Sequence, residues 1–415
     1  MKHVMLASVA ALSLQLALPA TAQVAIKAAT LHTMSPSGTI SDGVVVITNG
    51  KIAAVGKSAE TPIPAGYTVI EGAVATPGLI DSRGTVGVSG ILNQKQDQDQ
   101  LERSSPIQPE LRAIDAFNPA DRLVEWVRSF GVTTIHTGHA PGELISGQTC
   151  VVKTTGRPIE ECTVLAVATV SATLGPWSEK GGSASPGTRA KQISMLREEL
   201  LKTQDYAKRR ERATPANAGD EEKDRPPADR NLRSEAMLRV LNREVPLLIT
   251  ANRAQDIGSA LRLAKEFNIH IILDSGAESY LLIDDLRAAG VPVILHASMA
   301  RAVGDMENAS RETAATLTGA GIPVAIQSGY ESYVPKSRVV LFEAAQTAAH
   351  GMTFDQALAA ITTAPATILG IADRVGSIAV GKDGDVAIFD GDPFEYTTHC
   401  TGVVIEGRVV SDTVR

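Results

Sequence analysis

Three histidines and one aspartate lie at or just after the ends of predicted strands, and these residue types can do acid-base or metal chemistry. His136 and His139 follow one apolar run, while Asp274 and His296 end two later ones. Neutral imidazole is the commonest metal ligand in proteins and a frequent general base. We take these four as candidate catalytic residues. The alternative is that they hydrogen-bond loop backbone or a bound anion, because two histidines three apart in a Gly-containing loop are not a defined metal-ligand spacing.

Positively charged side chains also fall near predicted strand ends. Arg83, Lys153 and Arg253 suggest a basic lining that would attract an anion, since arginine binds a carboxylate or phosphate through two parallel hydrogen bonds. We therefore take these three as candidate substrate-binding residues. Ordinary salt bridges are the alternative, with Asp81, Asp274 or Glu331 as partners.

Two tyrosines follow the last apolar run of the central region. Tyr330 and Tyr333 lie beside Glu331 in a chain of which only 4% is aromatic. Tyrosine combines a large apolar body with a polar tip, which suits a ligand pocket. We add Tyr330 to the candidate substrate-binding residues.

A long central region must position these candidates, and in it apolar strand-like runs alternate with helical stretches. Eight parallel strands with intervening helices are typical of a TIM-type (β/α)8 barrel, an α/β fold whose functional residues lie at the carboxyl ends of the strands. The predicted strands are 79–81, 132–136, 149–153, 164–169, 247–250, 270–274, 291–296 and 324–327.

Both ends of the chain have β-strand patterns. The runs 44–47 and 51–55 flank Asn49-Gly50, the strongest short hairpin signal, and two C-terminal runs flank Glu406-Gly407. We therefore predict one small β-sandwich formed by both termini. The predicted boundaries give residues 23–75 to the β-sandwich, residues 76–370 to the barrel and residues 371–415 to the β-sandwich again.

The barrel pattern is interrupted by an insertion at 171–243. A Gly/Ser/Pro stretch precedes a predicted helix over 188–210, and a charged, Pro-containing stretch follows at 211–230. We interpret the charged stretch as a solvated loop, with a lid or a partner surface as the alternative.

The first 22 residues have the pattern of a secretory signal peptide. Lys2 precedes the apolar stretch 4–18, and Ala20-Thr21-Ala22 offers small residues for cleavage. We expect an exported, periplasmic protein without a membrane span, since no other segment approaches ~18 apolar residues. An oxidising compartment permits a Cys150–Cys162 disulfide, and buried free thiols are the alternative.

Longer motifs resemble a known family. The stretch Ala75-Thr76-Pro77-Gly78-Leu79-Ile80-Asp81 and the closing run 374–385, which ends in Gly381-Lys382-Asp383-Gly384-Asp385, resemble the amidohydrolase superfamily in its imidazolonepropionase-like branch. The resemblance covers essentially the whole chain after residue 22. It implies the barrel with its appended β-sandwich, and hydrolysis of an amide or cyclic-amide C–N bond by one or two divalent metals at the barrel mouth.

The resemblance also implies a ligand set that this sequence lacks. The family places His-x-His after strand 1, Lys or Glu on strand 4, His after strands 5 and 6, and Asp after strand 8. Strand 4 has no Lys, Glu or His, and the other positions hold Arg83, Thr85, Thr250, Ser275 and Gly329. Because a zinc site needs about three suitable ligands and a guanidinium repels cations, we predict that the standard metal centre is lost. Zinc would then bind only at a relocated site made by the candidate histidines and Asp274.

Two functions stay open. The chain is either a hydrolase with non-standard chemistry or a catalytically inactive barrel that binds a small molecule or serves in assembly. In both cases we expect a small-molecule partner, anionic if the basic lining binds it. Nucleic acid is not an expected partner, because the net charge is -7. The oligomeric state, a homo-oligomer included, stays open.

Overall fold

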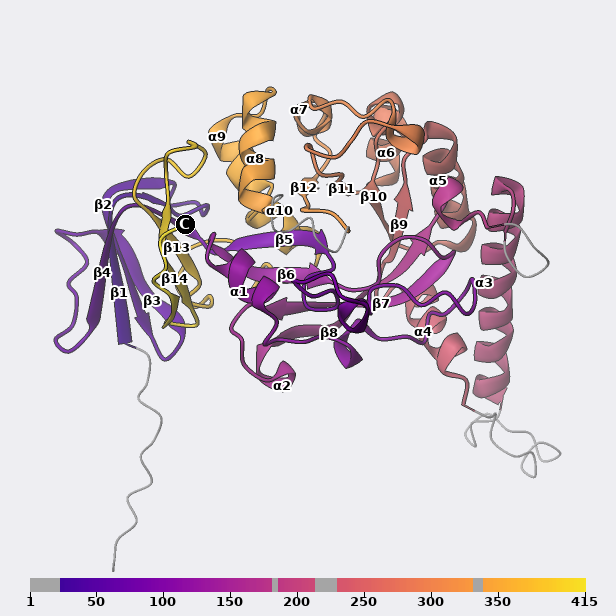
Figure 1. Cartoon of the computed structure of the whole chain (residues 1–415), viewed down its shortest axis with the longest axis horizontal. Coiled ribbons are helices and arrows are strands. Elements are labelled where there is room, and N and C mark those ends of the chain that lie inside the picture. The colour runs from indigo at the N-terminus through magenta and orange to yellow at the C-terminus, as the bar shows by residue number, and fades with distance from the viewer. Residues whose placement is uncertain (1–22, 181–185, 213–229, 331–338) are drawn as a thin grey trace, which may run out of the picture.

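The structure is a computed structural model that describes residues 23–180, 186–212, 230–330 and 339–415. Two sheets organise these residues, an eight-stranded barrel and a seven-stranded sheet that joins both ends of the sequence (Figure 1). The predicted fold class is confirmed. Within the described ranges, no helix is both long and apolar enough to cross a bilayer.

Three sequence predictions fall outside the described residues. They concern the signal peptide at 1–22, residues 213–229 of the charged stretch, and the pocket contacts of Glu331 and Tyr333. The helix predicted over 188–210 is confirmed, because α3 spans Arg189–Arg212.

Each of the eight predicted central runs forms a barrel strand. The chain after β12 returns to β5 through a bridge between Gly329 and Gly84, which brings the two end strands of the barrel sheet together. The barrel strands are β5 (Leu79–Gly84), β6 (Val132–Thr137), β7 (Ile145–Lys153), β8 (Thr163–Thr173), β9 (Leu247–Ala251), β10 (Ile271–Ser275), β11 (Val293–Leu295) and β12 (Val324–Ile326).

Helices connect most of these strands. Between β8 and β9, the long helix α3 packs against α4 and forms the insertion at the right of Figure 1. The remaining helix bounds are α1 (Arg122–Arg128), α2 (Ile159–Cys162), α4 (Leu232–Leu241), α5 (Ala254–Phe267), α6 (Ile283–Ala289), α7 (Thr313–Gly319), α8 (Val340–Ala349), α9 (Phe354–Ala359) and α10 (Thr363–Ile368).

One barrel strand runs against the predicted direction. β7 pairs antiparallel with both β6 and β8, whereas the other pairs in the barrel sheet are parallel. A parallel crossover needs about a dozen residues or more. The connections 138–144 and 154–162 are shorter, so each reverses the chain direction. The C-terminal end of β7 therefore lies at the opposite end of the barrel from the C-terminal ends of its neighbours.

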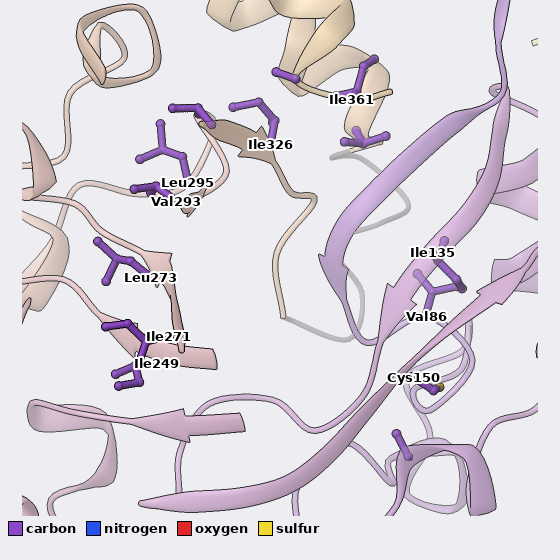
Figure 2. Close-up of a cluster of buried hydrophobic side chains, with 14 of the residues drawn as sticks. Val86, Ile135, Cys150, Ile249, Ile271, Leu273, Val293, Leu295, Ile326 and Ile361 are labelled. Carbon is purple, nitrogen blue, oxygen red and sulfur yellow. The ribbon is translucent and has the colours of Figure 1, made fainter. Parts of the chain in front are cut away.

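Alternation along the strands decides which side chains face the barrel interior. Four apolar side chains on β9 to β12 form a separate cluster, namely Leu248, Ile272, Ile294 and Ala325. Their sequence neighbours Ile249 and Leu273 belong instead to the large core cluster shared with the outer helices (Figure 2). Since successive side chains point to opposite faces, Thr250 and Asp274 share the face of the small cluster, nearer the carboxyl ends. The interior therefore becomes polar towards the mouth.

The terminal sheet joins β1 (Gln23–His32), β2 (Thr39–Thr48), β3 (Lys51–Lys57) and β4 (Thr68–Pro77) to β13 (Val386–Phe389), β14 (Cys400–Ile405) and β15 (Arg408–Ser411). Asn49 and Gly50 have φ angles of 52° and 81°, as the predicted hairpin turn requires. The Ile52 amide donates to the Lys382 carbonyl, and the Gly384 amide donates to the Gly50 carbonyl. These bonds link β3, one edge of the sheet, to the segment before β13, so the sheet curls on itself.

The three cysteines are free, buried thiols. The disulfide between Cys150 and Cys162 that the sequence left open is not formed, and the alternative of buried thiols describes the structure. Burial raises the pKa of Cys150 to about 12 and that of Cys162 to about 11, which keeps both thiols protonated at neutral pH.

Candidate functional site

A cavity of about 420 Å³ lies at the barrel mouth. Its wall is formed by Ser275, the last residue of β10, and by the segments that follow β5, β6, β8, β11 and β12. This is the end of the fold at which barrels place their binding sites. Residues that line the cavity include Leu101, Trp177, Ser275, His296, Gln327 and Tyr330. This volume suits a small molecule.

Arg83 lies beneath this cavity, inside the barrel. Its side chain is 0% exposed and donates to the His139 carbonyl and, over 3.3 Å, to Ser171 Oγ. Its Nε is 3.8 Å from Asp274 Oδ2, and its Cζ is 5.4 Å from the centre of the Tyr330 ring. These partners follow or belong to β6, β8, β10 and β12, so a guanidinium from β5 reaches into the centre of the barrel.

Asp274 is the acceptor that gathers the other polar groups of the interior. Its Oδ2 accepts from Thr250 Oγ1 at 2.6 Å, and its Oδ1 accepts from Gln327 Nε2 at 2.8 Å and from Tyr330 Oη at 2.7 Å. Burial and the Asp274 charge hold the pKa of Tyr330 well above its usual range, so its hydroxyl stays protonated and donates. Three neutral donors and one cation thus satisfy a fully buried carboxylate.

His136 is held in one tautomer by two hydrogen bonds. Its Nδ1 lies 2.7 Å from the Ser82 carbonyl, which only accepts, so Nδ1 carries the proton. Its Nε2 therefore accepts from Thr149 Oγ1, also at 2.7 Å. Burial and the nearby Arg83 charge lower the pKa of His136 to about 3. Both ring nitrogens are used, so His136 has no free lone pair for a metal or a substrate.

The other two candidate histidines differ in position. Burial and Arg83 lower the pKa of His139 to about 4, and its ring packs against the backbone of Gly147. His296 lines the mouth cavity, and burial also lowers its pKa. The described residues contain no group of three or more His, Cys, Asp or Glu side chains that could hold a metal. The hypothesis of a relocated metal site at His136, His139, His296 and Asp274 is therefore wrong for the described ranges.

Asp81 ends up below the mouth, braced against β12. Its Oδ1 accepts from the backbone amides of Ser328 and Arg83, and its Oδ2 accepts from Ser328 Oγ. Burial outweighs these bonds and raises the pKa of Asp81 to about 6. Of the salt-bridge partners that the sequence suggested for the basic residues, Arg83 therefore pairs with Asp274 and not with Asp81.

Lys153 does not lie at the mouth, and its prediction as a substrate-binding residue is wrong. Because β7 is antiparallel, its last residue lies at the end of the barrel that faces the terminal sheet. There Lys153 Nζ is 2.6 Å from Asp383, 3.1 Å from Asp385 and 3.1 Å from Glu406. The side chain is only 2% exposed, so Lys153 joins the barrel to the terminal sheet.

Arg253 follows β9 on the side of the mouth, but carboxylates already hold it. Its Nη1 is 2.8 Å from Glu278, its Nη2 is 2.6 Å from Glu307, and its Nε is 3.8 Å from Asp305. The alternative of ordinary salt bridges describes Arg253, although the partners differ from those expected from the sequence. Neither Arg253 nor Arg83 is among the residues that line the cavity, whereas Tyr330 is.

Known proteins match this chain over most of its length. A model of the amidohydrolase family matches residues 235–411. The amidohydrolase tasK of Hapsidospora irregularis is 25% identical to this chain over 405 residues. The match covers 89% of this chain and 40% of that protein, so the chain spans less than half of that relative. The crystal structure of an amidohydrolase from Thermotoga maritima is 26% identical, covers 94% of this chain and all of its own, and has a TM-score of 0.85. The chain belongs to the amidohydrolase superfamily.

A more distant solved structure shares the fold alone. The adenosine deaminase from Xanthomonas campestris, solved with bound zinc, is 14% identical, and the match covers 93% of this chain and 92% of that one with a TM-score of 0.54. The superfamily implies a divalent metal at the mouth of the barrel. Whether this chain can hold such a metal depends on the side chains at that place.

The residues at the metal positions do not fit a metal. Arg83 places a buried guanidinium where the first histidine is expected, and a guanidinium stays charged and has no lone pair to donate. Thr250 donates to Asp274, and Ser275 donates to Asn252 Oδ1 at 2.6 Å. The remaining positions are equally engaged, with Thr85 bonded to Ser89 and Gly329 paired with Gly84. A cation in this centre would meet one positive charge and a single carboxylate that is already saturated.

Sequence reasoning missed several residues of the mouth. Gln327, at the end of β12, both donates to Asp274 and lines the cavity, and Trp177, Gln100 and Arg103 line it from two other loops. A glutamine that ends a run of apolar strand residues is a signal that was available, because a buried amide needs partners. No local pattern marks Gln100 and Arg103, since only the folded loop after β5 brings them to the cavity.

Proposed function

We propose that this chain is a small-molecule-binding member of the amidohydrolase superfamily that works without the metal centre of the superfamily. The observation that carries the proposal is the buried Arg83 guanidinium, 3.8 Å from Asp274 at the place where metal ligands are expected. The pair fills the catalytic centre, while the cavity above it stays large enough for a ligand. We further propose that the chain belongs to the imidazolonepropionase-like branch and is exported to the periplasm, on the sequence motifs and the first 22 residues.

A second candidate function is hydrolysis of an amide or cyclic-amide bond without a metal. His296 favours it, because its ring lines the cavity and burial keeps it neutral, as a general base must be. The buried His136, with both nitrogens bonded, does not support this role.

The test compares metal content, hydrolysis and ligand binding in one preparation. Protein purified from the periplasm without chelators or an affinity tag is analysed for metals, then assayed against N-acyl amino acids, dipeptides and cyclic ureas, and screened for ligands by thermal shift. The proposal expects no stoichiometric metal, no turnover and at least one stabilising ligand. Turnover that is insensitive to chelators and is lost in His296→Phe would establish the second candidate instead. A stoichiometric metal required for activity would contradict both.

A further inference from the structure

A second hollow, which we call the base groove, lies at the amino-terminal end of the barrel. Pro246, His270 and Pro292 line it, and they directly precede β9, β10 and β11. Ser275, at the other end of β10, lines the mouth cavity, so the two hollows lie at opposite ends of the barrel. The volume of the base groove is about 1400 Å³. Since small-molecule sites measure about 300 to 1,000 Å³, the base groove has room for a larger partner.

Apolar side chains line part of the base groove and are not fully covered by the protein. Leu165, Val167, Leu261 and Ile368 line it, and each of these side chains is partly exposed. Apolar surface gathered in one hollow gains free energy when a partner removes it from water. An extended chain can enter such a hollow, whereas the flat surface of a bilayer would meet only its rim.

The charge of the base groove is positive although the whole chain has a net charge of -7. The charged residues that line it are the cations Arg189, Arg239, Arg243, Arg262 and Lys265 and the anions Glu244 and Asp285. Glu244 is already bound, because its carboxylate lies 3.5 Å from Arg239 Nε and accepts from Asn242 Nδ2 at 3.0 Å. The local excess of cations therefore favours an anionic partner.

Three of the cations have no carboxylate partner among the described residues. Arg262 donates to Ser259 Oγ at 2.8 Å, and Lys265 forms no ion pair in the part of the chain that the structure describes. Arg243 donates through both Nε and Nη2 to a single atom, His270 Nε2, with Nε at 2.8 Å. This edge of a guanidinium is one that can bind a carboxylate through two parallel hydrogen bonds.

His270 occupies that edge of Arg243 as a weak acceptor. Both side chains are exposed and line the base groove, so a partner can reach the contact between them. Burial and the Arg243 charge lower the pKa of His270, which keeps the ring neutral at pH 7. A carboxylate binds a guanidinium more strongly than a neutral imidazole does, because both partners are then charged. An incoming carboxylate can therefore displace the His270 ring.

We propose that the base groove binds an extended acidic peptide segment of a partner protein, and that one peptide carboxylate displaces His270 from the Nε and Nη2 edge of Arg243. Arg262 and Lys265 attract further carboxylates of the peptide. Its apolar side chains cover the partly exposed apolar lining of the groove. The site is separate from the mouth cavity, so this inference does not depend on the proposed function.

The experiment titrates the full chain with peptides of opposite charge by calorimetry. The probe is an N-acetylated, C-amidated peptide of four Glu-Leu repeats, and the comparison peptide has four Lys-Leu repeats. We expect the acidic peptide to bind at least about tenfold more tightly, although the net charge of the chain favours the basic one. Equal or tighter binding of the basic peptide, or no binding of the acidic one, would overturn the inference. So would sedimentation with phosphatidylglycerol vesicles that Arg243→Gln abolishes, if the acidic peptide does not compete for it.

Three variants locate the binding. Arg243→Gln removes the bidentate edge and should weaken the acidic peptide at least about tenfold. Arg287→Gln is the matched control, because Arg287 is an exposed arginine on α6 that pairs with Asp284 and does not line the base groove. His270→Ala removes the competing acceptor and should strengthen binding about threefold. Equal loss in the two arginine variants would overturn the assigned site, and weaker binding in His270→Ala would overturn the displacement of the ring.

Discussion

Arg83 and Asp274 face each other inside the barrel, with 3.8 Å between Arg83 Nε and Asp274 Oδ2 and with both side chains fully buried. Arg83 comes from β5 and Asp274 from β10, which is not adjacent to β5 in the sheet. The pair therefore crosses the interior. In the metal-dependent relatives that the family resemblance implies, this place would hold cations, whereas here one cationic side chain supplies the positive charge from within the chain.

The first prediction concerns the energetic coupling of this pair. Asp274→Asn leaves a buried guanidinium without a counter-ion, so it should lower the free energy of unfolding by about 3 to 5 kcal/mol. Arg83→Met should cost somewhat less, because Asp274 keeps three neutral donors. The double variant should lose less than the sum, with a coupling of about 1 to 3 kcal/mol in urea unfolding. The exposed pair Arg287 and Asp284 is the control and should couple by less than about 0.5 kcal/mol. Additive losses for the buried pair would contradict the assignment.

The second prediction compares two lysines that contact one carboxylate. Lys153 and Lys51 both reach Asp383, at 2.6 and 2.5 Å, but their side chains are 2% and 53% exposed. Lys153→Met strands the buried Asp385 as well, so it should cost about 3 to 5 kcal/mol. Lys51→Met should cost about 1 kcal/mol or less, because water replaces the exposed ammonium. Chemical denaturation of the two variants side by side measures this, and similar losses would show that the barrel and the terminal sheet are not joined in this way.

The position of Lys153 shows which feature of the fold the sequence could not easily predict. The barrel strands were predictable, because β9 to β12 are short, nearly continuous apolar runs flanked by helices. The reversal of β7 was missed although the connections 138–144 and 154–162 carried the signal in their length. Assuming eight parallel strands placed Lys153 at the mouth, while one reversed strand moves it to the other end.

The candidate site was predictable in composition and not in pairing. The sequence showed that Arg83 and Thr250 stand where metal ligands are expected, which is a statement about residue types at known stations. The sequence offered Asp274 as one of three partners for the basic residues, but it could not single out Asp274 for Arg83. It also could not show that Gln327 would donate to that carboxylate, because these contacts join strands that are far apart along the chain. Polar pairs inside a barrel depend on register and on the direction in which each side chain reaches, and neither leaves a local pattern.

The third prediction concerns strain at the mouth. Ser275 has a φ of 75°, a left-handed conformation that side chains other than glycine rarely adopt, at the end of β10 beside the cavity. Ser275→Gly and Ser275→Ala both remove the hydroxyl that donates to Asn252, so their difference isolates the strain. The glycine variant should be more stable than the alanine variant by about 1 kcal/mol in thermal or urea unfolding. An alanine variant that equals or exceeds the glycine variant would show that the backbone here is unstrained.

The fourth prediction is a pH dependence that Asp81 adds to stability. Its folded pKa of about 6 lies above its ordinary value of 3.8, so between these pH values the folded chain keeps a proton that the unfolded chain has lost. The contribution of Asp81 to the free energy of unfolding is complete below pH 3.8 and is lost as the pH rises through 6. The free energy of unfolding then falls by up to about 1.4 kcal/mol per pH unit. Asp81→Asn should remove this component, since the Ser328 hydroxyl can accept from an amide as readily as it donates to the carboxylate. Urea unfolding from pH 4 to pH 7 measures the difference between wild type and variant, with the exposed Asp285→Asn as the control. A difference that stays constant over this range, or that grows in favour of the wild type as the pH rises, would mean that burial does not raise the Asp81 pKa.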